Sequence, residues 1–131
     1  MVAVGKRKKS IARAVIRKGS GKIRINKKPL ELIEPRYRRM RIQEALTIAG
    51  DIAKSADIDV SVTGGGIWGQ VDASRTAIAN ALVGWSKDKK LKSMYLSYDR
   101  SLLIADARRT EPHKPSRSTA GPRRTKQQSK R

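Results

Sequence analysis

The distribution of charge along the chain is the sequence feature that most restricts its fold. The 131 residues carry 31 Lys and Arg against 11 Asp and Glu, a net charge of +20. Residues 1–41 hold 15 Lys and Arg and two Glu, and residues 106–131 hold nine Lys and Arg and two acids, whereas residues 42–105 are neutral. Self-repulsion of this size opposes compaction unless a polyanion neutralises it. The pattern predicts one domain of ordinary size, with a neutral packed segment between two anion-binding segments.

The C-terminal segment, residues 106–131, has a composition unlike that of the rest of the chain. Its only apolar side chains are two alanines, and it contains three prolines. Such a segment buries too little apolar surface to offset the entropy lost on ordering. We therefore expect a globular α+β domain over residues 1–105 and, over residues 106–131, an extended basic tail that is disordered when free and ordered by phosphate groups.

Several classes of protein are excluded by residues that the chain lacks. It has no Cys, so disulfide scaffolds, thiol catalysis and cysteine-ligated zinc are ruled out. The only imidazole, His113, lies in the tail, where a surface position beside phosphate is expected, and no Ser, His and carboxylate pattern suggests a nucleophile. No apolar run is long enough to cross a bilayer, and the N-terminus does not resemble a signal peptide. We expect a cytoplasmic nucleic-acid-binding protein without a cofactor, metal, membrane association or small-molecule substrate.

Two stretches near the N-terminus alternate in the way of β-strands. In residues 10–17, small and apolar side chains alternate with a side that carries Arg13 and Arg17. Residues 22–26 alternate again, with two isoleucines inward and polar or cationic residues outward. The glycine-containing residues 18–21 between them are typical of a turn. We predict an antiparallel hairpin with one cationic face.

The rest of the domain interleaves helical and strand patterns. After Pro35 the apolar residues follow helical spacing, and four arginines between Arg36 and Arg41 crowd the helix start, where the helix dipole disfavours cations. Two interpretations are open: phosphates lie near these arginines, or the helix starts later, near Met40. The α+β fold class is expected, as a mostly antiparallel four-stranded sheet with two main helices. The further elements are a strand at residues 58–62, a glycine loop at 63–70, a helix at 71–85, a short helix at 87–94 capped by Ser86, and a strand at 102–104.

The glycine loop satisfies a weak nucleotide-binding pattern. Gly64, Gly66 and Gly69 form G-x-G-x-x-G between a predicted strand and a predicted helix. The acidic residue expected about 20 positions further on would be Asp88, which follows no predicted strand, and no Gly-Lys-Ser/Thr sequence follows as in a Walker loop. Two compatible interpretations are left: a tight strand-to-helix joint, and a loop whose free N–H groups and close backbone approach bind phosphate.

The aromatic residues lie outside the predicted strands. Proteins that read single-stranded bases often carry aromatic side chains on an open sheet. Their absence from the strands here favours recognition of the backbone and shape of a nucleic acid. Trp85, on the apolar stripe of a helix, is expected in the core, whereas Trp68, in the glycine loop, fits either a structural or a binding role. The full set is Tyr37, Trp68, Trp85, Tyr95 and Tyr98.

Four stretches of the chain together resemble one family. They are GKRKKSIARAVIRKGSGKIRIN (5–26), GGGIWGQVDASRTAIANAL (64–82), DARRTEPHKP (106–115) and the final SKR (129–131). In this order, they are similar to the small-subunit ribosomal protein nine family, the universal S-nine family. EPHKPSRS (111–118) resembles the archaeal and eukaryotic branch. The chain departs from that branch at its end, where Ser-Lys-Arg is similar to bacterial members and replaces Ser-Tyr-Arg.

The resemblance implies a fold and partners that composition does not show. The implied fold is that of the second domain of small-subunit ribosomal protein five, with a left-handed βαβ crossover, although right-handed crossovers are the rule. The implied place is the head of the small subunit, where rRNA of the 3′ major domain and neighbouring head proteins are the partners. The tail would thread through rRNA and touch the anticodon stem-loop of the P-site tRNA. Matched by position from the end, the tRNA-binding residues would be Lys130, Arg131, Ser129 and Lys126.

We therefore expect a structural RNA-binding protein of the ribosome that acts in translation and is not an enzyme. Two other classes are weighed beside it: a chromosome-compacting protein that binds duplex DNA without sequence preference, and an enzyme that binds a nucleotide in the glycine loop. The expected rRNA-binding residues come from the basic N-terminal segment, the helix start, the glycine loop with the helix after it, and the tail. They are Lys6, Arg7, Lys8, Lys9, Arg13, Arg17, Lys22, Arg24, Arg38, Arg39, Gly64, Gly65, Gly66, Gln70, Arg75, Arg108, Arg109, Lys114, Arg117, Arg123 and Arg124.

Overall fold

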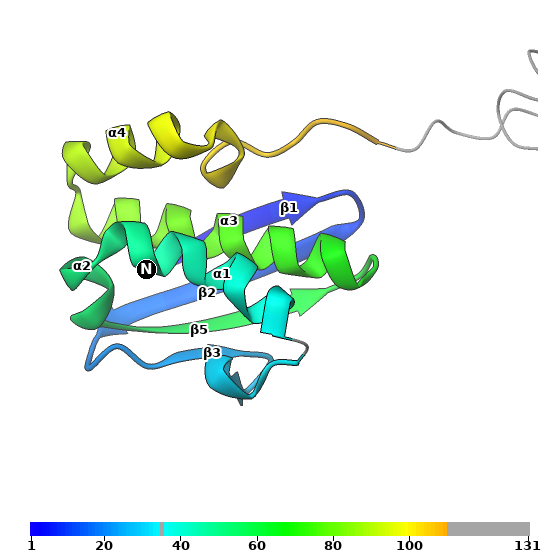
Figure 1. The fold of residues 1–131 in the computed structure, drawn as a ribbon, viewed down its shortest axis with the longest axis horizontal. Helices are drawn as coiled ribbons and strands as arrows, with labels where there is room; N and C mark the ends of the chain where they lie inside the picture. The colour runs from blue at the N-terminus through cyan, green and yellow to red at the C-terminus, as the bar shows by residue number, and fades with distance from the viewer. Residues whose placement is uncertain (35, 110–131) are drawn as a thin grey trace, which may run out of the picture.

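The computed structural model describes residues 1–34 and 36–109, which form a single α+β domain with its helices on one face of a mixed sheet (Figure 1). The strands are β1 (Val2–Arg7), β2 (Ser10–Lys18), β3 (Ile23–Ile25), β4 (Lys28–Pro29) and β5 (Ala56–Thr63). The helices are α1 (Arg36–Ala49), α2 (Asp51–Lys54), α3 (Ile67–Ser86) and α4 (Lys89–Tyr98), with short 3-10 turns η1 (Leu30–Leu32) and η2 (Arg100–Leu102). The predicted fold class is confirmed, and the sheet has five strands instead of four.

The order of strands in the sheet is β1-β2-β5-β3-β4, so the predicted hairpin of residues 10–26 is wrong. Both of its strands form, but β5 lies between them, antiparallel to β2 and parallel to β3. The turn after β2 wraps the end of β5, because the Asp57 carboxylate accepts hydrogen bonds from the backbone N–H groups of Ser20, Gly21 and Lys22 at 2.9–3.2 Å. These hydrogen bonds, that of Lys22 foremost, lower the pKa of Asp57.

The connection from β3 through α1 to β5 joins two neighbouring parallel strands. In Figure 1 the helices lie in front of the sheet, both strands run from left to right, and β5 lies above β3. That arrangement gives the crossover a left-handed sense, which is rare among βαβ units.

Several predicted element boundaries are also wrong. Residues 2–7 form an edge strand that was not predicted. Only Ala3 and Gly5 of this stretch face inward, and the basic residues at its end obscure the alternation. Leu102 does not begin a strand; it is fully buried at the end of η2, a turn that Asp99 closes by accepting from the Ser101 N–H at 2.9 Å. Asp88, and not Ser86, caps the short helix α4 by accepting from the Lys90 N–H.

The sequence left open where the first helix starts, and the structure answers that question. Helix α1 begins at Arg36, so the arginines up to Arg41 all lie inside it and the alternative start near Met40 is wrong. Helix α3 likewise begins earlier than predicted, at Ile67, with Gly66 at its N-cap. The glycine loop is therefore shorter than predicted, because the last four residues of the predicted loop, 67–70, belong to α3.

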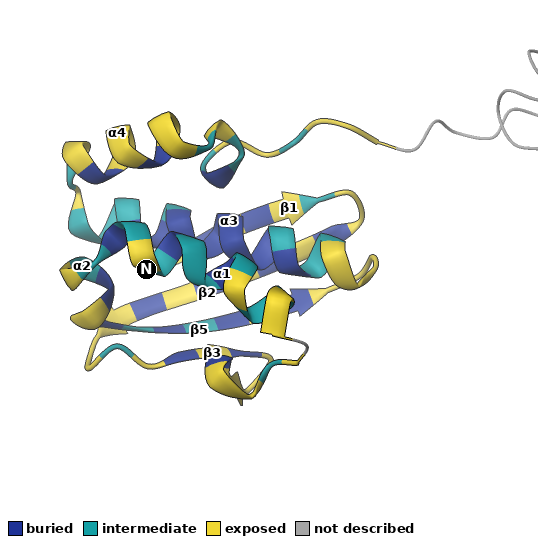
Figure 2. Cartoon of the chain, in the orientation of Figure 1, coloured by how far each residue is buried: buried dark blue, intermediate teal, exposed yellow. Residues whose placement is uncertain are grey.

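The core lies between the sheet and α3, whose inward side is buried along most of its length (Figure 2). Ala12, Ala14 and Ile16 of β2 face this core, while the alternate residues of the strand are exposed, as the alternation predicted. Tyr95 of α4 is fully buried, and its hydroxyl donates to the Ala45 carbonyl of α1 at 2.6 Å. The far face of the sheet carries no helix of the described chain and is open along β1 and β2.

Candidate nucleic-acid interface

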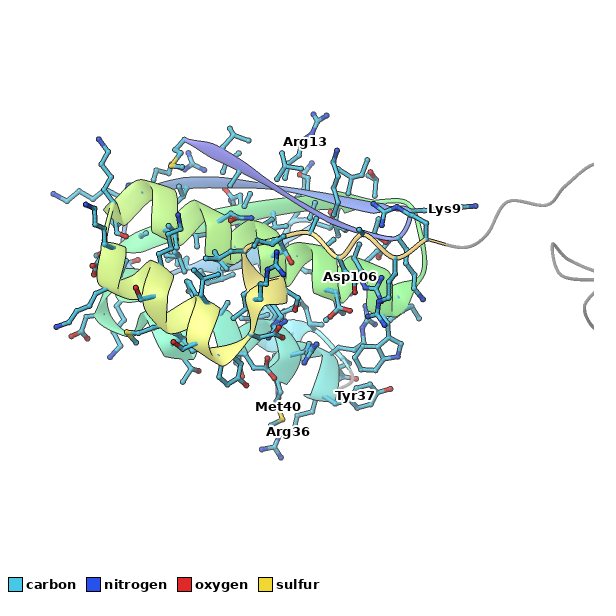
Figure 3. All side chains as sticks on the ribbon, turned by 90° about the horizontal axis from the view of Figure 1, so that it is seen from above. Lys9, Arg13, Arg36, Tyr37, Met40 and Asp106 are labelled. Carbon is cyan, nitrogen blue, oxygen red and sulfur yellow. The ribbon has the colours of Figure 1, made fainter. Side chains whose placement is uncertain are left out.

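The open face of the sheet carries a row of arginines. Arg13 projects from β2 away from the helices (Figure 3), and it forms no ion pair within residues 1–34 and 36–109. Arg17 and Arg24 share the Asp59 carboxylate, with Nη2 of Arg17 at 2.7 Å and Nε of Arg24 at 2.8 Å. The hydrogen bond from Arg24, followed by that from Arg17, lowers the pKa of Asp59 although partial burial opposes it. This face is therefore cationic, and Asp59 offsets part of its charge.

The apolar side chains between these arginines are also exposed. Val4 pairs directly with Arg13 across β1 and β2, and Val15 pairs with Asp59 in the same way across β2 and β5. Val2, Val4, Ile11 and Val15 have exposed fractions of 40–60%. The open face thus combines positive charge with exposed apolar side chains, and its described strands hold no aromatic residue.

A second cationic surface is formed where four segments meet at one end of the domain. The β1–β2 turn, the glycine loop, the start of α3 and the first residues of the tail lie at this end (Figures 1 and 3), and the start of α1 adjoins it through the contact of Tyr37 with Trp68. We call it the basic end. The exposed cations and loop glycines of the basic end are Lys8, Lys9, Gly64, Gly65, Gly66, Arg108 and Arg109.

The glycine loop is a tight joint, as one of the two interpretations predicted. Gly64 and Gly65 have φ values of +77° and +67°, in the left-handed region that favours glycine. A Cβ on Gly65 would overlap the hydroxyl of Ser10, which is fully buried and donates to the Gly64 carbonyl at 2.9 Å. The Gln70 side chain donates to the same carbonyl at 3.2 Å. Gly66 has open space around it, so a ligand could approach the backbone there.

The first residues of the tail are attached to the domain by ion pairs. Asp106 accepts from Arg108 and also lies 3.7 Å from Nη1 of Arg7, whose Nε is 3.9 Å from Asp72. The hydrogen bond from Arg108 lowers the pKa of Asp106. These groups line a cavity of about 90 Å³ between β1, α3 and the tail. The contact with Arg7 holds Asp106 against the end of β1.

Arg75 does not lie on a surface, in contrast to the expectation from the sequence. Its residue is 2% exposed, and Nη2 lies 2.8 Å from Glu44 and 3.3 Å from Asp99. The pKa of Asp99 is lowered, because hydrogen bonds from Ser101 and the charge of Arg75 outweigh its partial burial. Arg75 thus joins α1, α3 and the segment before the tail, and it does not belong to the candidate interface.

Replacing Arg75 by Met is therefore expected to destabilise the fold without changing RNA affinity. Losing one partner of a buried ion pair costs about 3–5 kcal/mol, and the partial exposure of Glu44 and Asp99 reduces this to about 2 kcal/mol. Urea unfolding measures the loss. A folded R75M protein whose RNA-binding salt slope falls by one phosphate contact would contradict this assignment.

The other expected rRNA-binding residues divide into exposed, partly engaged and undescribed groups. Lys6 and Lys22 are exposed. Arg38 and Arg39 donate to the backbone carbonyls of Glu34 and Glu31 at 3.0 and 2.8 Å, so part of each guanidinium is already engaged. His113 and the tail residues expected to bind rRNA or tRNA lie outside the described residues: Lys114, Arg117, Arg123, Arg124, Lys126, Ser129, Lys130 and Arg131.

Sequence reasoning missed one exposed pair of aromatic residues. Tyr37, near the start of α1, stacks on Trp68, near the start of α3, with ring centroids 5.2 Å apart and planes at 21°. No sequence signal pointed to this pair, since the residues are 31 positions apart and lie on different helices. Trp68 lies at the basic end, and Tyr37 adjoins it from the start of α1.

Metal-binding clusters and membrane spans are both absent from the described part of the chain. No group of three or more His, Cys, Asp or Glu in residues 1–34 and 36–109 could hold a metal ion. None of the helices in these two ranges is long and apolar enough to cross a membrane.

An α+β domain with a cationic open sheet, a cationic end and a basic tail has the features of a small nucleic-acid-binding protein. Residues 5–131 match the family described as "Ribosomal protein S9/S16". Over 126 residues the chain is 57% identical to the small ribosomal subunit protein uS9 of Methanococcus vannielii and 56% identical to that of Methanococcus maripaludis strain C7. Each match covers 96% of this chain and 94% of the relative.

The chain therefore belongs to the ribosomal protein S9/S16 family, which confirms the resemblance seen in the sequence. It is a non-enzymatic structural protein of the small ribosomal subunit, acting in translation on the cytoplasmic ribosome. The alternative of a nucleotide-binding enzyme built on the glycine loop is thereby excluded.

Proposed function

We propose that this protein binds rRNA of the head of the small subunit, in its 3′ major domain, through the open sheet face, the basic end and the tail. The observation that carries the proposal is that the glycine loop lies at one end of the domain together with the basic residues at the end of β1 and at the start of the tail, Arg108 and Arg109, while the middle segment of the chain is neutral. The neutral, packed segment is then the scaffold that positions cations from distant parts of the chain. Neighbouring head proteins are the further partners.

Counterion release gives this proposal a direct test. Each phosphate that a Lys or Arg neutralises adds about −0.7 to −0.9 to the slope of log affinity against log salt. Arg13 is a cation of the open face without an ion-pair partner among the described residues, so Arg13→Gln should reduce the slope by about one such step. Titration of a small-subunit rRNA head fragment over a range of KCl concentrations measures it. Lys92→Gln, on the exposed side of α4, removes one charge away from the proposed surfaces and should leave the slope unchanged.

Competition between duplex DNA and rRNA distinguishes an rRNA-binding protein from a compactor of duplex DNA. An rRNA binder recognises the shape of folded RNA in addition to its charge. Excess duplex DNA should therefore displace labelled head rRNA far less well than unlabelled head rRNA does. Equal displacement by the two competitors would favour the DNA compactor.

We further propose that the end of the tail contacts the anticodon stem-loop of the P-site tRNA through Lys130 and Arg131, with Ser129 and Lys126 nearby. The support is the resemblance of the terminal sequence to the family and the chemistry of Arg131, whose planar, permanently charged group matches a phosphate.

Deleting Lys130 and Arg131 should weaken retention of P-site tRNA while the protein still assembles into small subunits. Charge-assisted hydrogen bonds contribute about 1.5–3 kcal/mol each, so loss of one such contact should speed tRNA dissociation on the order of tenfold or more. Filter-binding kinetics with reconstituted subunits measure dissociation, and co-sedimentation in a sucrose gradient verifies assembly. Identical dissociation from deleted and intact subunits would remove this role.

A further inference from the structure

The Tyr37–Trp68 pair is exposed to a degree that packing within the domain does not explain. Tyr37 is 57% exposed and Trp68 is 51% exposed, although the two rings are stacked at 5.2 Å and 21°. Ile67, beside Trp68, is 57% exposed, and Met40, one turn after Tyr37, is 51% exposed. The pair thus has large uncovered aromatic surface at the centre of an exposed apolar patch.

The surroundings of the pair are cationic and mark it as a site for a polyanion. Arg36 precedes Tyr37 and is exposed, and Figure 3 shows both side chains at the same corner of the domain. Lys9 is exposed in the β1–β2 turn, away from Arg36 and Tyr37 in Figure 3, and its carbonyl lies against Gly64 of the glycine loop that leads into Trp68. An apolar partner protein would have to bury these cations, whereas an RNA strand would neutralise them with its phosphates.

Aromatic rings beside cations bind single-stranded nucleic acid through two separable interactions. Cations hold the phosphates, and an uncovered ring stacks on the face of a base that is not stacked in a helix. Because stacking is not electrostatic in origin, it strengthens binding without adding to the salt slope. A ring pair already stacked on itself offers its outer faces without further ordering of the side chains.

We propose that the Tyr37–Trp68 pair is a stacking site for an unpaired nucleobase of RNA, with phosphates of the same strand on Arg36 and Lys9. The inference deepens the proposed rRNA-binding function and rests on it. It gives the protein one place of base contact beside surfaces that otherwise contact the backbone, and it locates the site at the basic end, next to the glycine loop.

Two ribose-phosphate strands of equal length test the proposal on the full-length protein. One strand is a decamer of adenylates, and the other is an abasic decamer with the same number of phosphates. In a Trp85→Phe background, in which Trp68 is the only tryptophan, the adenylate strand should quench tryptophan fluorescence and the abasic strand should not. Trp68→Leu, which keeps apolar bulk without a stacking ring, should weaken binding of the adenylate strand by about 5- to 150-fold at an unchanged salt slope.

Matched variants separate stacking from a general effect on the fold. Trp68→Tyr restores an aromatic ring and should recover most of the affinity that Trp68→Leu loses. Tyr98→Ala removes an aromatic residue that is also 58% exposed, on α4, and should leave binding unchanged. Unfolding curves verify that every variant is folded under the binding conditions.

The outcomes distinguish this inference from the function on which it rests. If wild type and W68L bind the adenylate and abasic strands equally, with the salt slope intact, the stacking site is wrong and the rRNA-binding proposal stands. If head rRNA binds without a salt slope while the adenylate strand still quenches Trp68, the electrostatic proposal fails and the stacking site stands. Equal loss of affinity for both strands in W68L would also overturn stacking, because the ring would then support the fold or the phosphate contacts.

Discussion

Removing residues 110–131 is expected to abolish most of the salt dependence of rRNA binding while the domain stays folded. The segment holds seven Lys and Arg, and seven neutralised phosphates correspond to about 5–6 units of the salt slope. The truncation removes this charge without touching the buried residues of the described domain, the last of which is Leu102. Affinity at low salt should fall by several orders of magnitude.

The position of the cut follows from the contacts of the tail's first residues. Asp106 and Arg108 are hydrogen-bonded to each other, and Asp106 is paired with Arg7, so a chain that ends at Arg109 keeps these contacts. A full-length variant with the same seven cations replaced by Gln is the control, since it keeps the length of the tail and removes only its charge. Both variants should unfold in urea at the wild-type midpoint. A truncated protein that binds rRNA with the wild-type slope would show that the tail does not lie on phosphates.

The parts of the fold that were predictable are those that local sequence determines. The alternation in residues 10–17 predicted both the strand and its buried side, because side chains of a strand point alternately to the two faces. The partner of that strand was not predictable in the same way. The partner is β5, from a distant part of the sequence, and Asp57 of β5 accepts hydrogen bonds from the backbone of residues 20–22, more than 30 positions away.

The start of α1 shows how tertiary contacts override a local rule. Cations near a helix N-terminus are disfavoured by the dipole, which made a later start at Met40 a reasonable alternative. In the structure Arg39 donates to the Glu31 carbonyl, and Arg41 donates to Asp72 of α3 at 3.3 Å. These acceptors come from outside the helix and offset the unfavourable placement, so the helix begins at Arg36.

The positive charge of the candidate site was predictable from the sequence. Which cations are exposed and which are buried in ion pairs was not. Arg13 and Arg75 are both single arginines in apolar surroundings, yet one is exposed on the open sheet and the other is buried with two acidic partners. A signal for the second was present. Arg75 falls four positions after Val71 and three before Ile78, on the apolar stripe of a helix, where a charged residue is expected to be paired inside the protein.

The close contact of β1 with α3 leads to the largest stability effect that we expect from one methyl group. Gly5 of β1 pairs with Ala12 of β2 and faces the backbone of α3. A Cβ at this position would overlap the Ala73 carbonyl and lie 2.5 Å from the Ala77 nitrogen. Both atoms belong to the helix backbone, so no side-chain rotation can relieve the overlap.

Gly5→Ala should therefore destabilise the protein by about 3 kcal/mol or more, at the upper end of the cost of overpacking, because α3 must move away from the sheet as a whole. In a domain of this size that corresponds to a fall in Tm of about 12 °C or more. Gly66→Ala is the matched control. That residue has φ −96° and no atom within 4 Å of the added methyl, so it should cost less than about 1 kcal/mol. Thermal and urea unfolding compare the two variants, and equal stability would mean that β1 does not lie in direct contact with the backbone of α3.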